Sequence, residues 1–63
     1  MPSKAGDTLR RLRGDKPREA VAKAVGISVR ALQSYENGDR VPRDEVKQKL
    51  ADYYHRSVQF IFF

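Results

Sequence analysis

Residues 18–38 restrict the fold of this chain more than any other stretch, because they have the pattern of two short helices joined by a tight turn. Val21, Ala22 and Val25 recur at the spacing of one helix face, and Gly26 then interrupts this pattern. Glycine readily adopts the positive φ with which many helices end. The stretch therefore predicts a helix, a turn and a second helix that packs across the first.

The second helix of this pair has an apolar back and a polar front. It begins at Ser28, a good N-cap residue, and Leu32 and Tyr35 form its inward face. The side chains of the opposite face are Arg30, Gln33, Ser34 and Asn37. A short helix with a buried back and a cation-bearing front is what the major groove of DNA accepts.

The order of these positions resembles the Cro and lambda-repressor-like helix-turn-helix family. The matching positions are Ala22, Gly26, Ile27, Leu32, Tyr35, the triplet Glu36-Asn37-Gly38, Pro42 and the final stretch 57–62. No single position is specific, but the ordered set runs from about Leu9 to Phe62. The resemblance implies an all-α, compact five-helix domain over residues 1–63, with the helix-turn-helix at about residues 17–37.

The rest of the pattern is compatible with five helices. The expected helices cover residues 6–13, 17–25, 28–37, 43–54 and a short last helix capped by Ser57. Leu9 and Leu12 face inward from the first helix, and His55 ends the fourth. One apolar stripe marks the fourth helix, at Val46, Leu50, Tyr53 and Tyr54.

The charge of the chain is positive and unevenly distributed. The formal net charge is +5; residues 1–30 hold eight basic and three acidic side chains, whereas residues 31–63 hold five of each. A one-sided basic field suits a polyanion such as nucleic acid. The alternative is a solvated basic surface without a specific partner.

Several classes of protein fit the sequence poorly. There is no cysteine and one histidine, so neither a disulfide nor a metal site is expected, and nothing indicates a cofactor or a small-molecule ligand. Asp44, Glu45, Asp52 and His55 lack the converging nucleophile, base and orienting group of an active site, so no enzyme is expected. No apolar run reaches membrane-helix length and no signal peptide begins the chain, so we expect no membrane partner and a cytoplasmic protein.

The candidate base-reading residues lie on the helix over 28–37. Arg30 can pair with guanine O6 and N7, with a phosphate contact as the alternative, and Gln33 can pair with adenine or remain solvated. Ser34 belongs to the same face but is also placed to reach sugar or phosphate. Val29 departs from the polar residue common in the family, and either contacts a thymine methyl or supports the turn.

A second group of residues is expected to contact the DNA backbone. Arg18 occupies the helix start where the family often has a phosphate-binding glutamine, and we interpret it as a phosphate clamp. The alternative is an exposed arginine that pairs with Glu19 or Asp15. The remaining candidates are Lys16, Lys23, Ser28, Asn37, Arg40 and Arg43.

The resemblance also implies a structural ion pair between Arg13 and Glu36. The Leu-Arg pair of the family corresponds to Leu12-Arg13, and that arginine usually binds the glutamate of the Glu-Asn-Gly motif. The loop between the first two helices is about two residues shorter than is common, so the alignment requires a deletion there.

The C-terminal aromatic residues indicate a partner surface. A chain this short cannot bury all of them, and Phe60 or Phe63, with Arg56, is expected to lie on a dimer or partner patch. The sequence thus predicts a double-stranded DNA-binding regulator, a repressor that binds a two-fold operator as a homodimer. The alternatives are a protein-binding module, such as an antitoxin or an antagonist of another regulator, and a non-specific nucleic-acid binder. The operator, the choice between repression and activation, and truncation of a longer regulator stay open.

Overall fold

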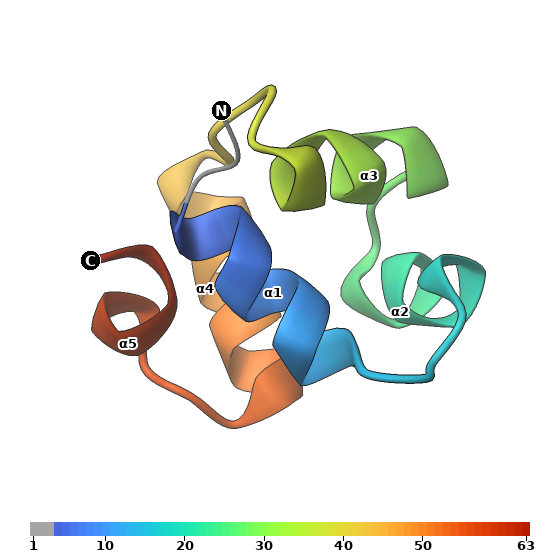
Figure 1. Ribbon diagram of the computed structural model, residues 1–63. Coiled ribbons are helices and arrows are strands. Elements are labelled where there is room, and N and C mark those ends of the chain that lie inside the picture. Colours follow the sequence, from blue (N-terminus) through green and yellow to red (C-terminus); the bar gives the residue numbers. More distant parts are fainter. Residues whose placement is uncertain (1–3) are drawn as a thin grey trace.

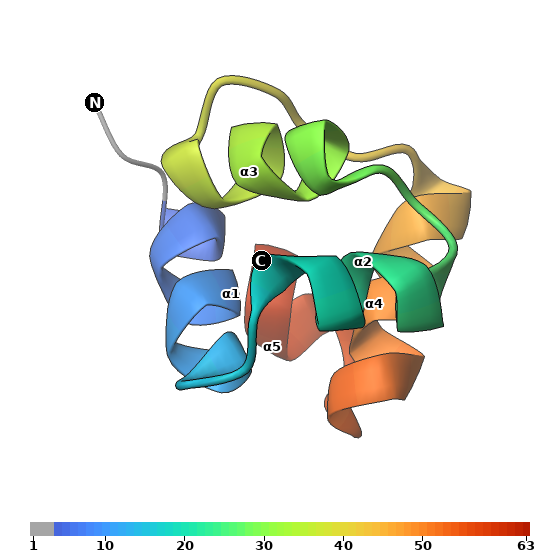
Figure 2. The same cartoon turned by 90° about the vertical axis from the view of Figure 1, so that its right-hand side faces the viewer.

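All regular structure in the computed structural model, which describes residues 4–63, is helical. The helices are α1 (Lys4–Arg13), α2 (Arg18–Val25), α3 (Val29–Asn37), α4 (Asp44–Tyr54) and α5 (Val58–Phe62). In Figure 1, α2 and α3 lie to one side of α1 and α5 lies to the other, and Figure 2 shows α1 and α4 at opposite sides of the molecule. This arrangement confirms the predicted all-α, five-helix fold.

The turn between α2 and α3 has the backbone geometry that the sequence predicts. Gly26 adopts φ 89°, and its N–H donates to the carbonyl of Ala22. A Cβ at this glycine would meet nothing within 4 Å, so the requirement for glycine is conformational rather than steric. The Ser28 side chain then accepts a hydrogen bond from the N–H of Ala31 at 3.0 Å and caps α3. In the view of Figure 2, α3 consequently crosses above α2.

The starts of α1 to α4 each differ from the prediction by one or two residues. The first helix begins at Lys4, two residues early, and includes the buried Gly6, where packing outweighs the low helix propensity of glycine. Pro17 is the N-cap of α2 and not its first helical residue. Its carbonyl accepts hydrogen bonds from the N–H groups of Ala20 and Val21. Arg43 is likewise the N-cap of α4, which begins one residue later than predicted.

His55 ends α4 in the left-handed conformation, with φ 57°. Its N–H donates to the carbonyl of Asp52, and the N–H of Arg56 donates to that of Ala51. These bonds satisfy carbonyls at the end of the helix, as glycine usually does at this position. The reversal sends the chain back toward α5, whose first turn is capped by the Ser57 side chain.

One apolar core joins all five helices. Its buried members are Leu9, Val21, Ala22, Val25, Leu32, Tyr35, Leu50, Ala51, Tyr54 and Ile61. Of the stripe predicted on the fourth helix, Leu50 and Tyr54 are buried, whereas Val46 and Tyr53 are partly buried and pack against the core. Ala51, which the stripe omitted, is also fully buried.

Candidate nucleic-acid interface

The outward face of α3 presents a mixed polar and apolar surface. Arg30 and Gln33 are exposed at its front, Ser34 is half-buried, and Val29 is 39% exposed. Leu32 and the rest of the inward face are buried. A helix fixed from behind therefore holds out the four side chains that the sequence nominated for base contact.

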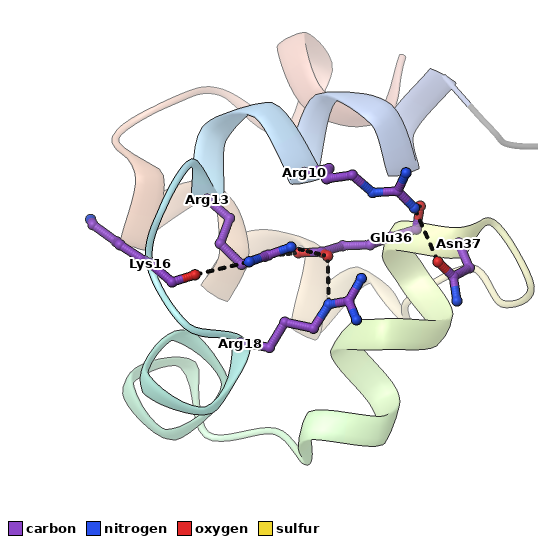
Figure 3. Close-up of polar contacts among 6 residues, drawn as sticks. All are labelled: Arg10, Arg13, Lys16, Arg18, Glu36 and Asn37. Atoms are coloured by element: carbon purple, nitrogen blue, oxygen red, sulfur yellow. Dashed lines mark hydrogen bonds and ion pairs between the residues drawn. The ribbon is translucent and has the colours of Figure 1, made fainter.

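The inward face of α3 also carries a buried charge. The Glu36 side chain is 0% exposed and receives two guanidinium groups from different helices. Arg13 of α1 donates Nε to Oε2 at 2.7 Å and Nη2 to Oε1 at 3.1 Å, and Arg18 of α2 donates Nε to Oε1 at 2.9 Å. Figure 3 shows both arginines converging on the carboxylate. The predicted partners Arg13 and Glu36 are thus in contact, despite the short loop between α1 and α2.

This cluster keeps an excess of positive charge. A buried carboxylate is tolerated only when it is paired and hydrogen-bonded, and here two cations meet one anion. The hydrogen bond to Glu36 is the main reason why the pKa of Arg13 is raised above its ordinary value. Arg13 also donates Nη1 to the Lys16 carbonyl at 2.9 Å, which fixes the loop that leads into α2. The three helices are therefore joined at one polar point.

Arg18 lies at the start of α2, where a phosphate-binding residue was expected, but it also forms an ion pair with Glu36. Its ion pair in the described residues is with Glu36, and not with Glu19 or Asp15 as the alternative had it. Its side chain is 30% exposed, compared with 16% for Arg13. Arg18 thus binds α3 from behind while part of its side chain stays accessible at the start of α2.

Sequence reasoning missed the role of Arg10. Its Nη2 donates to the Glu36 carbonyl at 3.2 Å and to Asn37 Oδ1 at 3.0 Å. A cation there satisfies a carbonyl of the last turn of α3 and meets the negative end of the helix dipole. The signal in the sequence was the three-residue spacing of Arg10 and Arg13, which places both on one face of α1. Asn37, nominated for the DNA backbone, is oriented by this bond (Figure 3).

Tyr54 contributes a buried hydroxyl beside this cluster. The hydroxyl has no hydrogen-bond partner among residues 4–63. Burial, followed by the nearby Glu36 carboxylate, raises the pKa of Tyr54 to about 12. The neutral phenol is therefore strongly favoured in the folded protein.

The other nominated cations lie on the surface. Lys23 and Arg43 are exposed, as is Lys16, whose Nζ lies 5.3 Å from the centre of the Tyr53 ring. The Arg40 guanidinium lies 5.8 Å from the centre of the Tyr35 ring.

The nominated C-terminal patch is exposed at both phenylalanines. Phe60 is 59% exposed and Phe63 is 78% exposed. The Arg56 guanidinium lies 5.8 Å from the centre of the Phe60 ring. The sequence expected at least one of the two phenylalanines to face outward, and both do.

Residues 4–63 contain no cluster of three or more metal-ligating side chains. Within the same range, every helix is too short or too polar to cross a membrane.

Comparison with known proteins agrees with this geometry. A protein-family model described as a helix-turn-helix domain matches residues 4–59, which include α1 to α4 and the start of α5. No curated protein matches the chain. The match confirms the resemblance drawn from the sequence.

Proposed function

Since the chain belongs to the Cro and lambda-repressor-like helix-turn-helix family, we propose that it is a sequence-specific, double-stranded DNA-binding repressor that binds a two-fold operator as a homodimer. One observation carries the proposal: α3 exposes Val29, Arg30 and Gln33 while Glu36 on its back is bonded to α1 and α2. A rigidly held helix with an accessible polar front is the element that reads base edges in the major groove.

Arg30 and Gln33 are the principal base-reading residues in this proposal. Arginine forms a bidentate hydrogen-bonded pair with guanine, and glutamine forms one with adenine. Each such pair favours the correct base over a wrong one by about 1–3 kcal/mol. The partly exposed Val29 contacts a thymine methyl group. Ser34 reaches a base edge or the adjacent sugar from the same face.

The backbone contacts are supported by exposed donors around α2 and α3. Arg18 binds phosphate at the start of α2, where the helix dipole also favours an anion. The further contacts come from Lys16, Lys23, Ser28, Asn37, Arg40 and Arg43. If about five of these contacts form per subunit, the logarithm of affinity falls with the logarithm of salt at about −0.9 per contact.

The dimer is proposed to form through Phe60, Phe63 and Arg56. Two exposed phenylalanines at one end of a 63-residue chain are an apolar surface that association would cover. A two-fold dimer would place the two α3 helices in successive major grooves, about one turn of DNA apart. Binding there would repress transcription by blocking polymerase, in the cytoplasm and on the nucleoid.

Selection of binding sites from a random duplex pool tests the proposal. Wild type, Arg30→Ala and the control Arg11→Ala would be selected side by side at about 150 mM salt, where non-specific binding is weakened. We expect an inverted repeat whose guanine preference is lost only with Arg30→Ala. If Arg30→Ala weakened binding to all DNA sequences equally, the protein would recognise only the charge of DNA.

The exposure of Phe60 and Phe63 also supports a second candidate function. The same patch would serve a protein-binding module, such as an antitoxin or an antagonist of another regulator. Loss of a protein partner on changing Phe60 and Phe63, with no selected DNA site for wild type, would favour this function.

A further inference from the structure

A cavity of about 280 Å³ lies at the end of the molecule opposite the turn between α1 and α2. The start of α1, the loop after α3, the start of α4 and the C-terminus come together there (Figure 1). Its walls are mostly apolar or aromatic and include Leu9, Tyr35, Val41, Pro42 and Phe62. Val41 is 78% exposed, so one wall is an apolar side chain with little protein covering it.

The charged side chains that line this cavity, among residues 4–63, are all cationic. They are Lys4, Arg40 and Lys47. Across residues 4–63, none of these three cations forms an ion pair with a carboxylate. An anion that entered the cavity would therefore meet positive charge that the protein has not already neutralised.

Aromatic rings hold two of these cations at the cavity. The Arg40 guanidinium lies over Tyr35, and Lys47 Nζ lies 5.6 Å from the centre of the Phe62 ring and 5.0 Å from that of Phe63. Cation–π contacts are weak at exposed sites, and they leave the N–H groups free to donate to an incoming anion. The lining of the cavity thus combines apolar side chains with cationic donors that lie against aromatic rings.

We infer that this cavity binds a small amphipathic anion, a molecule with a flat apolar body and a single carboxylate. The apolar body would pack between Leu9, Tyr35 and Phe62, and the carboxylate would accept from Arg40 and Lys47. Apolar walls with a few convergent polar groups are typical of small-molecule sites. The volume lies just below the usual range for drug-sized ligands, so a one- or two-ring acid is the fitting size.

A ligand in the cavity would also bind Arg40, a residue that we propose contacts the DNA backbone. Arg40 lines the cavity and is a proposed backbone contact, so a bound acid would compete with phosphate for the same guanidinium. This consequence rests on the proposed function, and it makes the acid an antagonist of DNA binding. Binding of the acid to the free protein does not depend on it.

Titration of the uniformly ¹⁵N-labelled full chain, followed by amide chemical shifts, tests the inference. The probes are 2-naphthoate, the neutral 2-naphthalenemethanol and the cationic 2-naphthylmethylammonium, which share one apolar body. For a ligand of this size we expect naphthoate to saturate with a Kd on the order of 1 mM or below. Shifts should centre on Ala5, Val41 and Phe62, and the alcohol and the ammonium should bind at least about tenfold more weakly.

The variant Arg40→Gln/Lys47→Gln should lose about tenfold or more in naphthoate affinity, because both donors to the carboxylate are removed. Arg11→Gln/Lys49→Gln removes the same charge from an exposed arginine and an exposed lysine that do not line the cavity, and should leave naphthoate affinity unchanged. Circular dichroism establishes that each variant is folded.

Equal binding of the three probes, shifts centred elsewhere, or equal loss in both double variants would overturn the inference. If naphthoate binds at the cavity but no DNA site is selected, the ligand site stands and the proposed function fails. If a DNA site is selected and naphthoate does not bind, the reverse holds.

Discussion

Arg13 and Glu36, which lie 23 positions apart, form two hydrogen bonds between the end of α1 and the end of α3, the shorter 2.7 Å long. The contact holds the recognition helix by its buried side, so its exposed side is free for a partner. Arg18 adds a bond from α2 to the same carboxylate. The orientation of α3 is thus set by charge as well as by apolar packing.

Replacing Glu36 by glutamine is expected to destabilise the fold by roughly 3 kcal/mol, because two partly buried guanidinium groups lose their anion. Urea denaturation measures the change in the free energy of unfolding. Glu45→Gln is the control, since Glu45 forms an exposed pair with Lys49 at 3.5 Å and should cost less than about 0.5 kcal/mol. A similar cost for both variants would contradict the structural role of the buried pair.

Arg18→Gln is expected to affect DNA binding more than stability. Arg13 donates twice to Glu36 and still neutralises it, so the loss of the single Arg18 bond leaves the carboxylate paired. The salt dependence of affinity for the selected site should become shallower by about 0.9, the value for one lost phosphate contact. Arg13→Gln is the matched variant and should show the opposite balance, a large loss of stability with an unchanged salt slope. An unchanged slope for Arg18→Gln would remove it from the DNA contacts.

Tyr54→Phe is expected to stabilise the protein at neutral pH by about 1 kcal/mol, since the removed hydroxyl has no protein partner in the described chain. The wild type should then lose further stability between pH 10 and pH 12. The pKa of Tyr54 is about 12 in the folded protein and has the ordinary value of 10.0 in the unfolded chain. The unfolded chain therefore loses this proton first, so the stability that the raised pKa contributes is complete below pH 10 and is lost as pH rises through 12. Thermal unfolding of both proteins from pH 7 to pH 12 measures the difference, which should widen only above pH 10. A constant difference would show that Tyr54 titrates alike in the folded and unfolded chains.

His55→Gly is expected to stabilise the fold by about 0.5–1 kcal/mol, because residue 55 has φ 57° and glycine adopts this conformation without strain. Gly26→Ala is the mirror experiment and should destabilise by about 1 kcal/mol, since φ there is 89° and no neighbouring atom compensates. Both changes are measured by urea denaturation. If His55→Gly lowered the free energy of unfolding, the histidine side chain would stabilise the fold by more than the left-handed backbone at residue 55 destabilises it.

Phe60→Ser/Phe63→Ser is expected to weaken self-association without unfolding the chain, because both side chains are largely exposed. Sedimentation equilibrium over a range of concentrations measures the dimer constant. Val29→Ser, which changes an exposed apolar residue on α3, is the control. Unchanged association in the double variant would place the dimer contact elsewhere.

The sequence predicted the parts of the fold that depend on local chemistry. Gly26 and Ser28 marked the turn and the cap of α3, and the apolar positions of α2 and α3 marked their inward faces. Helix starts were less accurate, because Gly6 and Pro17 occupy places that tertiary packing and capping decide.

The bonds that place the candidate site were harder to predict. Arg10 reaches the end of α3 from α1, and Arg18 reaches it from α2. The spacing of residues along one helix does not indicate which acceptor on another helix an arginine will bind. The family resemblance pointed to Arg13 and Glu36 alone. The cavity beneath Arg40 was also absent from the prediction, since its lining comes from five separate segments of the chain.

The carboxylate shared by Arg13 and Arg18 also bears on how this chain can change over generations. Losing Glu36 first would leave two cations facing each other, whereas losing Arg18 first leaves a neutral pair. Substitution of Arg18 before Glu36 is therefore tolerated better than substitution of Glu36 before Arg18. Position 18 is thus the one that can change first, while the ion pair between positions 13 and 36 is retained.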